Sequence, residues 1–199
     1  MYPEDMAAEA ARKDRQGRLQ QARSAYLSAW RDWAASRGQP TYPDANGSLR
    51  FTFGTVKGKA RDGMRWDAFT TDLGILEKAT GRDPFDAPER QLAALRNRAG
   101  FAGLARADGR LPVNFLSTTD ITNGNSGSAT LNARGELVGL AFDGTIEGVV
   151  SDWWFDESIS RTIHVDSRYM VWVMEQDGAR RLLEEMQVAR PAVTPAAGQ

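Results

Sequence analysis

The sequence has 199 residues, of which 41% are hydrophobic and 26% are charged, and it contains no cysteine. Its 25 basic and 26 acidic residues give a net charge of −1, so no basic surface for nucleic acid or for an anionic membrane is expected. The missing cysteine excludes disulfides, thiol catalysis and thiolate metal sites. No apolar run approaches the roughly 18 residues that span a bilayer, and the polar start, MYPEDMAAEAARKDR, is not typical of a signal peptide. We therefore expect either a cytosolic protein or a chain whose true beginning is missing.

Residues 4–37 are predicted to form one long amphipathic helix. They are rich in Ala, Arg, Gln, Glu and Leu, and there is no Gly or Pro between Gly17 and Gly38. Hydrophobic side chains recur at helical spacing, and such a stripe needs other structure to cover it. These residues are Leu19, Ala22, Tyr26, Leu27, Trp30 and Trp33. Gly38, Pro40 and Pro43 are expected to end the helix.

After residue 47 the pattern changes from one helix to short strands and short helices. The alternation of apolar and polar residues in SLRFTFGTVKGK, residues 48–59, predicts a strand. Its apolar positions are Leu49, Phe51, Phe53 and Val56. Residues 70–79 and 88–99 have the pattern of two short helices within a long connection.

The second half of the chain is predicted to contain four strands and a terminal helix. Residues 114–117 and 161–165 read as single strands, and residues 128–131 and 136–142 as an antiparallel hairpin joined by the turn NARG. Asp166 can cap a helix that runs through SRYMVWVMEQ, and GARRLLEEM continues as a second short helix. The organisation is a helical lead-in followed by a mainly β unit with helices.

Residues 121–128 read ITNGNSGS and carry the chemistry of a serine nucleophile. Glycines beside Ser126 allow positive φ and a close approach of substrate, and they leave N–H groups free to face a developing negative charge. The alternative is an ordinary turn, because Gly, Asn and Ser dominate turns for conformational reasons. The pattern is not a GxSxG elbow, since Ser128 replaces the second glycine and strands follow. A GxSG turn that enters a hairpin is typical of chymotrypsin-like double barrels, in which the amides of Gly124 and Ser126 would face the oxyanion.

A serine nucleophile needs a base, and His164 is the only histidine. It follows Ser126 in the chain, whereas chymotrypsin-like enzymes have the order His, Asp, Ser. We interpret His164 as a structural residue satisfied by a polar neighbour. The base is then expected outside this chain.

Three segments resemble the carboxy-terminal part of bacterial dipeptidyl aminopeptidases of the dipeptidyl-peptidase 7/11 type. They are YPDANGSLRFTFGTVKG, LPVNFLSTTDITNGNSGSATLNARGELVGLAFDG and RTIHVDSRYMVWVM, and the likeness runs from about residue 42 to 188 and more loosely through the first helix. The resemblance implies a chymotrypsin-like double β-barrel interrupted by an α-helical cap. Residues 1–42 would end the cap, residues 43–188 would form the second barrel with its C-terminal helix, and residues 189–199 would be a disordered tail.

The resemblance also implies that the chain is a fragment, because the histidine and aspartate of the catalytic triad would lie in the missing amino-terminal barrel. The full-length form would be periplasmic or secreted and could be a homodimer. Ala129 and Thr130 stand where Pro-Val is more usual, a change expected to alter packing only slightly.

The same resemblance assigns roles to the residues around the serine. Ser126 matches the nucleophile, Gly124 and Ser126 supply oxyanion amides, Asp143 helps to hold the free α-ammonium of the substrate, and Phe142 lines that pocket. An exopeptidase must measure a fixed distance from a positive N-terminus to the scissile carbonyl, and a carboxylate in a partly desolvated cleft can do so. The alternative for Asp143 is a turn residue, because Asp-Gly ends a strand. Gly144 matches the position at which an arginine accompanies acidic P1 side chains and a glycine accompanies hydrophobic ones.

These observations predict a serine-type dipeptidyl aminopeptidase that releases dipeptides from peptides with a free N-terminus, with a hydrophobic P1 preference. One alternative is a short, catalytically inactive module that binds peptides or a partner. A trypsin-like endopeptidase is a further alternative, which would leave Asp143 and the helical lead-in unexplained. No cofactor and no metal are expected, since one histidine and scattered carboxylates form no recognisable ligand set.

Overall fold

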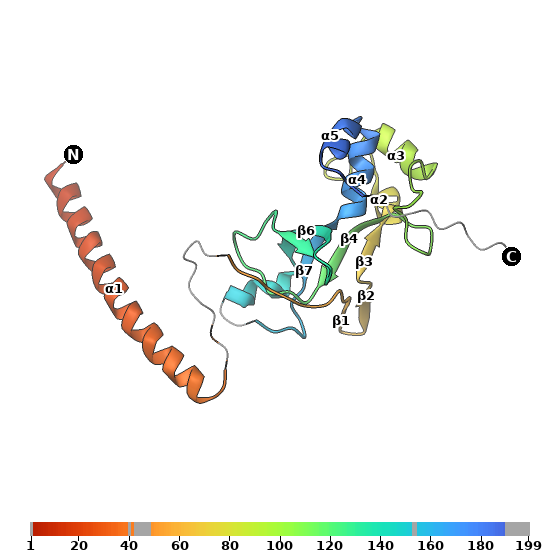
Figure 1. The fold of residues 1–199 in the computed structure, drawn as a ribbon. Coiled ribbons are helices and arrows are strands. Elements are labelled where there is room, and N and C mark those ends of the chain that lie inside the picture. Colours follow the sequence, from red (N-terminus) through yellow and green to blue (C-terminus); the bar gives the residue numbers. More distant parts are fainter. Residues whose placement is uncertain (1, 40, 42–48, 153–154, 190–199) are drawn as a thin grey trace. The chain divides into compact units, whose positions relative to one another are not determined.

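The computed structural model describes residues 2–39, 41, 49–152 and 155–189, and the chain divides into two compact units, Met1–Arg50 and Phe51–Gln199 (Figure 1). Among the described residues, no helix is both long enough and apolar enough to cross a lipid bilayer. The tail predicted to be disordered lies outside the described residues except for Ala189.

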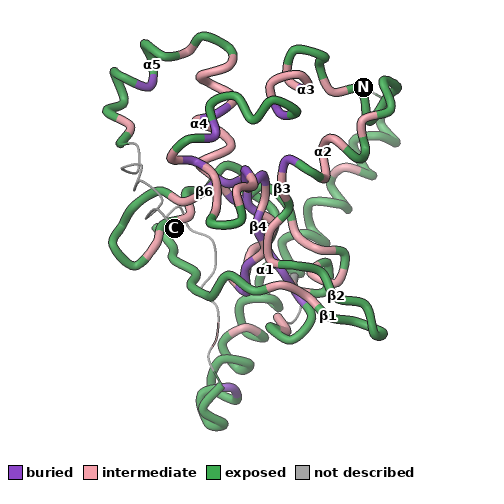
Figure 2. Tube along the Cα trace, turned by 90° about the vertical axis from the view of Figure 1, so that its right-hand side faces the viewer, coloured by how far each residue is buried: buried purple, intermediate pink, exposed green. Residues whose placement is uncertain are grey.

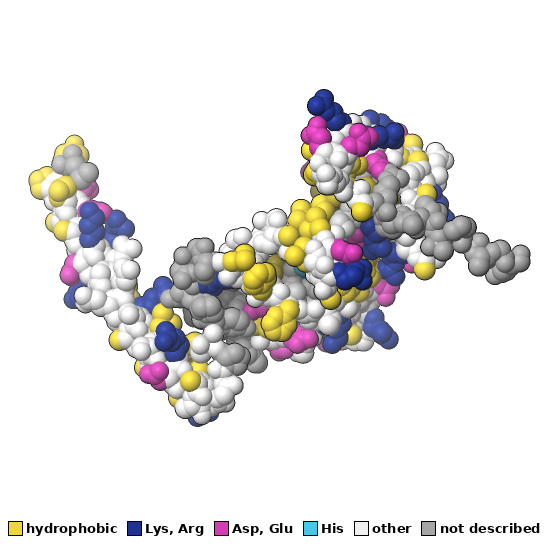
Figure 3. Space-filling view, viewed as in Figure 1, with side chains coloured by type: hydrophobic (Ala, Val, Ile, Leu, Met, Phe, Trp, Pro, Cys, Tyr) yellow, Lys and Arg dark blue, Asp and Glu magenta, His cyan; other side chains and the backbone are white. Residues whose placement is uncertain are grey.

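The first unit contains the helix α1, Pro3–Ser36, which confirms the long helix predicted from the sequence. Proline suits the first helical position because its missing N–H has no partner there in any helix. The stripe residues Leu19, Tyr26 and Trp33 remain exposed within this unit. On the visible face of α1, hydrophobic and charged side chains are interspersed (Figure 3). What covers the stripe is therefore not found among the described residues of the first unit.

The second unit is organised by a five-stranded antiparallel sheet in the order β3-β4-β7-β6-β5. In chain order the strands are β3 Phe69–Thr71, β4 Pro112–Ser117, β5 Ala129–Leu131, β6 Leu137–Gly144 and β7 Thr162–Asp166. The last four confirm the predicted strands and the predicted hairpin. Because β3 and β5 are edges, the sheet is not a closed barrel, and its place in a double barrel stays a prediction.

Helices gather at one end of this sheet (Figure 1). They are α2 Asp72–Lys78, α3 Glu89–Arg96, α4 Ser167–Gln176 and α5 Arg180–Glu185. Asp166 caps α4 as predicted, because its side chain accepts a hydrogen bond from the backbone N–H of Arg168 at 2.9 Å. Trp172 of α4 is fully buried, and its indole Nε1 donates to the carbonyl of Ala99 at 2.7 Å. The core lies between these helices and β4, where buried residues concentrate (Figure 2).

The strand predicted over residues 48–59 is wrong. Among residues 49–58 only Val56 forms a bridge, to Ser117, while Phe51 and Phe53 are 83% and 92% exposed. The apolar side chains of the alternating pattern stay exposed within this unit, and the segment does not become a regular strand. Figure 3 shows hydrophobic side chains exposed on the face of the unit that carries this segment and β6.

A small hairpin follows that segment and was not predicted. It is formed by β1 Lys59–Arg61 and β2 Met64–Trp66, which pair in antiparallel register. Asp62 and Gly63 form its turn with φ of 50° and 77°, values that an Asp-Gly pair adopts in a tight hairpin.

His164 joins three strands of the sheet from a buried position in β7. Its Nε2 lies 2.7 Å from the Ser117 hydroxyl of β4, and its Nδ1 lies 2.8 Å from the Thr130 hydroxyl of β5. The ring also stacks on Phe115 with centroids 4.5 Å apart. This confirms that polar neighbours satisfy the histidine. Thr130 therefore contributes more than packing, because its hydroxyl is one of the two hydrogen-bond partners of the His164 ring.

Burial lowers the pKa of His164 from 6.5 to about 4. Below about pH 6.5 the unfolded chain therefore takes up a proton that the folded chain does not, and we expect the free energy of unfolding to fall by up to about 3 kcal/mol between pH 6.5 and pH 4. Urea unfolding across this range should show the loss. His164→Gln removes the only histidine and should flatten this part of the profile, while carboxylates titrate alike in both proteins. Equal pH slopes in the two proteins would contradict the prediction.

Candidate active site

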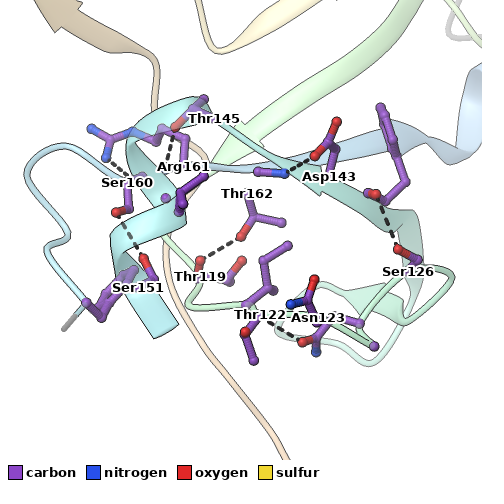
Figure 4. Close-up of a pocket in the computed structure, with 18 residues that line it drawn as sticks. Thr119, Thr122, Asn123, Ser126, Asp143, Thr145, Ser151, Ser160, Arg161 and Thr162 are labelled. Atoms are coloured by element: carbon purple, nitrogen blue, oxygen red, sulfur yellow. Dashed lines mark hydrogen bonds between the residues drawn. The ribbon is translucent and has the colours of Figure 1, made fainter. Parts of the chain in front are cut away.

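The five residues singled out from the sequence meet in one cleft of about 280 Å³ in the second unit (Figure 4). It is lined by the turn that follows β4, by the end of β6 with the residues after it, and by the start of β7. Gly124, Ser126, Phe142, Asp143 and Gly144 all belong to this lining. The structure therefore brings together the predicted nucleophile, oxyanion amides and substrate-binding residues.

The turn that presents Ser126 is fixed against β6. Gly127 donates its N–H to the carbonyl of Ala141 at 2.7 Å, and the N–H of Ala141 donates to the carbonyl of Ser128 at 2.9 Å. Gly124 and Gly127 have φ of +95° and +87°, a left-handed conformation that a side chain would strain. The glycines on both sides of Ser126 are thus required by the path of the backbone.

Asn125 organises the inside of this turn and was missed by the sequence analysis. Its Oδ1 accepts a hydrogen bond from the N–H of Thr122 at 3.0 Å, and its carbonyl accepts one from the N–H of Ser128 at 2.9 Å. Asparagine side chains commonly close turns in this way, so the Asn before the serine was the available signal.

Ser126 is exposed in the cleft, and its hydroxyl is not bonded to a base. Its Oγ donates to the carbonyl of Phe142 at 3.4 Å, a long contact that a substrate or a base could replace. His164 cannot serve, since both its ring nitrogens are bonded to hydroxyl groups elsewhere. Within the described residues, the backbone amides of Gly124 and Ser126 donate no hydrogen bond, and both residues are exposed. These two N–H groups can therefore bind an oxyanion.

The end of β6 places Phe142, Asp143 and Gly144 along the cleft. The pairing of β6 with β7 shifts register between Ala141 and Asp143, an irregularity of the kind that re-aims side chains near sites. Oδ1 of Asp143 accepts from the N–H of Gly144 at 2.8 Å, while Figure 4 shows its side chain standing clear of the sheet. A Cβ added at Gly144 would lie 3.7 Å from the carbonyl of Arg161, so the position has room for a side chain.

The far end of the cleft was not predicted. It is formed by the 3₁₀ helix η1, Ile146–Asp152, and by residues 155–162. Figure 4 shows Ser151 and Ser160 at the opposite end from Ser126. Their hydroxyls lie 3.3 Å apart. No hydrophobic period or motif marks this irregular stretch, so the sequence carried no signal for it.

Titratable residues in the described part of the chain form no group of three or more that could hold a metal ion. Among the groups described above, the cleft offers the hydroxyl of Ser126, the backbone N–H groups of Gly124 and Ser126, and the carboxylate of Asp143.

Comparisons with known proteins find relatives of this chain among bacterial dipeptidyl-peptidases. The chain is 39% identical to the Asp/Glu-specific dipeptidyl-peptidase of Shewanella putrefaciens over 96% of its length and 29% of the relative. It is 41% identical to dipeptidyl-peptidase 7 of Capnocytophaga gingivalis over 74% of its length and 21% of the relative. The crystal structure of Porphyromonas endodontalis DPP11 in complex with the dipeptide Arg-Asp matches 77% of the chain with a TM-score of 0.70 and 39% identity, covering 23% of that protein.

The chain spans between a fifth and a third of the length of these relatives. The model of the Peptidase S46 family matches residues 1–188, which is nearly the whole chain. The long helix, the sheet and the cleft all lie within that match. The chain belongs to the peptidase S46 family.

Proposed function

We propose that this chain supplies the nucleophile of a serine dipeptidyl peptidase that releases dipeptides from free peptide N-termini. The observation that carries the proposal is the single cleft in which an exposed Ser126 hydroxyl, two free backbone amides and Asp143 occur together. The dipeptidyl-peptidase names of the relatives support it.

The reaction would be acyl transfer. Ser126 Oγ attacks the carbonyl of the second substrate residue and passes its proton to a general base, while the N–H groups of Gly124 and Ser126 stabilise the oxyanion. The peptide C–N bond breaks, the amine leaves with that proton, and water then hydrolyses the dipeptidyl ester. We place the base outside the described residues, because His164, the only histidine, is bonded to Ser117 and Thr130.

Asp143 would fix the register of the substrate. A free α-ammonium that pairs with its carboxylate places the second carbonyl, and no other, beside Ser126. Once substrate covers the cleft, water is displaced and the ion pair strengthens well beyond its value in solution. Phe142 would line the same part of the cleft.

Gly144 would determine a hydrophobic P1 preference. With no side chain there, the middle of the cleft is open, and an apolar P1 side chain gains roughly 25 cal/mol for each Å² that it buries. The relatives include both Asp/Glu-specific enzymes and dipeptidyl-peptidase 7. Their names therefore do not decide the P1 preference, and the proposal for this chain rests on Gly144.

An inactive peptide-binding module is the second candidate, favoured by the lack of a base bonded to Ser126. The intact mass of the native protein separates the two. A species several times heavier than 21.9 kDa would support the peptidase, and a species of 21.9 kDa would favour the binding module. A periplasmic or secreted location and a homodimer follow only from the family resemblance and stay predictions.

Asp143→Asn, made in the protein as its source produces it, should lower kcat/KM on dipeptidyl coumarin amides about 100-fold, because the neutral amide loses the charged contact to the α-ammonium. N-acetylation of the substrate should cost the wild type a similar factor, and the two changes together should cost little more than either. Ser126→Ala should abolish hydrolysis of all substrates. Acetylated substrates cleaved as fast as free ones would exclude a dipeptidyl peptidase.

Gly144→Arg should move the P1 preference towards Asp and Glu. The position has room for a side chain, and a guanidinium in the cleft would pair with an acidic P1 group. The ratio of kcat/KM for a Glu-P1 over a Leu-P1 substrate should rise by about 100-fold. Gly74→Arg, at a glycine of α2 with open space around it, is the matched control and should leave the ratio unchanged. An unaltered ratio in Gly144→Arg would refute the assignment.

A further inference from the structure

The far end of the cleft is tied to the β1–β2 hairpin by two sets of polar contacts. We call residues 145–152 and 155–161 the cleft wall, because its residues Val149, Phe155 and Ser160 line the end opposite Ser126. The hairpin comprises β1 and β2, and Gly58 immediately precedes it. Both the wall and the hairpin belong to the second compact unit.

The first tie is the buried guanidinium of Arg161. Its Nε donates to the carbonyl of Gly58 at 3.0 Å, and its Nη1 donates to the carbonyls of Glu157 and Ser160, each at 2.6 Å. The side chain is only 4% exposed, and no carboxylate among the described residues pairs with it. Figure 4 shows it directed away from Ser126, towards Ser160. The charged guanidinium thus donates to backbone carbonyls, and its bond to Gly58 holds the wall to the chain before β1.

The second tie is the ion pairing of Glu147 in η1. Its carboxylate contacts the ammonium of Lys59 and lies 3.0 Å from Nη1 of Arg61, both in β1. The side chains of Glu147 and Lys59 are only 14% and 11% exposed, so solvent screens this pair weakly. The neighbouring ammonium of Lys59 lowers the pKa of Glu147 to about 2, so the carboxylate is ionised at neutral pH.

The backbone packs closely at the start of the hairpin. A Cβ added at Gly58 would lie 2.3 Å from the carbonyl of Trp66 in β2, so the backbone there is tightly packed. The ammonium of Lys59 also lies 5.7 Å from the centre of the Trp66 ring. The partners that hold the wall therefore lie in the hairpin and just before it, and these partners do not line the cleft.

We propose that Arg161 and Glu147 are positioning residues that set how closely the cleft wall approaches the P1 side chain, so that the hairpin determines P1 selectivity. The inference rests on the proposed peptidase function and deepens it. A P1 side chain that extends from a carbonyl at Ser126 runs along the cleft towards Val149 and Phe155. Apolar contact with these residues requires the wall to stay in place, whereas attack by Ser126 does not, because the turn at residues 121–128 is fixed separately against β6.

Arg161→Lys and Glu147→Gln, made in the native enzyme, test the proposal. For Leu-P1 dipeptidyl substrates we expect KM to rise about tenfold in each variant, with kcat within about twofold of wild type. For Gly-P1 substrates, which have no side chain to meet the wall, both constants should change less than about twofold. Arg134→Lys and Glu136→Gln, at an exposed ion pair in the β5–β6 turn, are matched controls and should change neither substrate.

Each other outcome overturns the inference. An equal loss on Leu-P1 and Gly-P1 substrates would mean that the contacts support the fold or the chemistry in general, and no change on either would mean that the wall does not depend on them. If Arg161→Lys does not fold, the kinetics of Glu147→Gln decide the question. This requires that the midpoint of thermal unfolding of Glu147→Gln match that of Glu136→Gln. A wild-type enzyme that cleaves no dipeptidyl substrate would instead remove the proposed function, a result visible before any variant is made.

Discussion

The pair of hydrogen bonds between Ala141 and the turn residues Gly127 and Ser128 is the contact on which the candidate site depends. It fixes the turn of the nucleophile to the same strand that ends in Phe142, Asp143 and Gly144. Residues separated in sequence by the whole β5–β6 hairpin therefore share one cleft. The separation of Ser126 from Asp143, which would measure the substrate, is set by a sheet rather than by flexible loops.

Much of the fold could be predicted because its elements carry local signals. The apolar spacing in residues 4–37, the NARG turn and the cap at Asp166 each have a physical cause within a few residues, and the structure contains the elements they predict. The strand predicted over residues 48–59 was wrong because alternation indicates only that one face of a strand would be apolar and the other polar. It does not indicate whether other residues will pack on either face, and here Phe51 and Phe53 stay exposed within their unit.

The residues that line the cleft near Ser126 could be predicted from the sequence, and those at the far end could not. Ser126 stands between glycines whose left-handed backbone leaves a mark in the sequence, and the residues that end β6 follow an apolar strand. Arg161 left no such mark. Its partners are backbone carbonyls, one of them about a hundred residues away, and carbonyls are the same in every residue. A contact of this kind is set by tertiary packing alone.

The open surroundings of Gly144 have a consequence for how enzymes of this kind diverge. The residue has an ordinary backbone conformation, and among the described residues an added Cβ would meet only the carbonyl of Arg161 at contact distance. Glycines in the nucleophile turn, in contrast, are held by their positive φ. Under the role proposed for Gly144, mutation can change the cleft at a position that costs the fold little, while the glycines of the turn at residues 121–128 stay under strong conformational constraint. The enzyme encoded by a duplicated gene could then change its substrate preference through one codon and keep the turn at residues 121–128 unchanged.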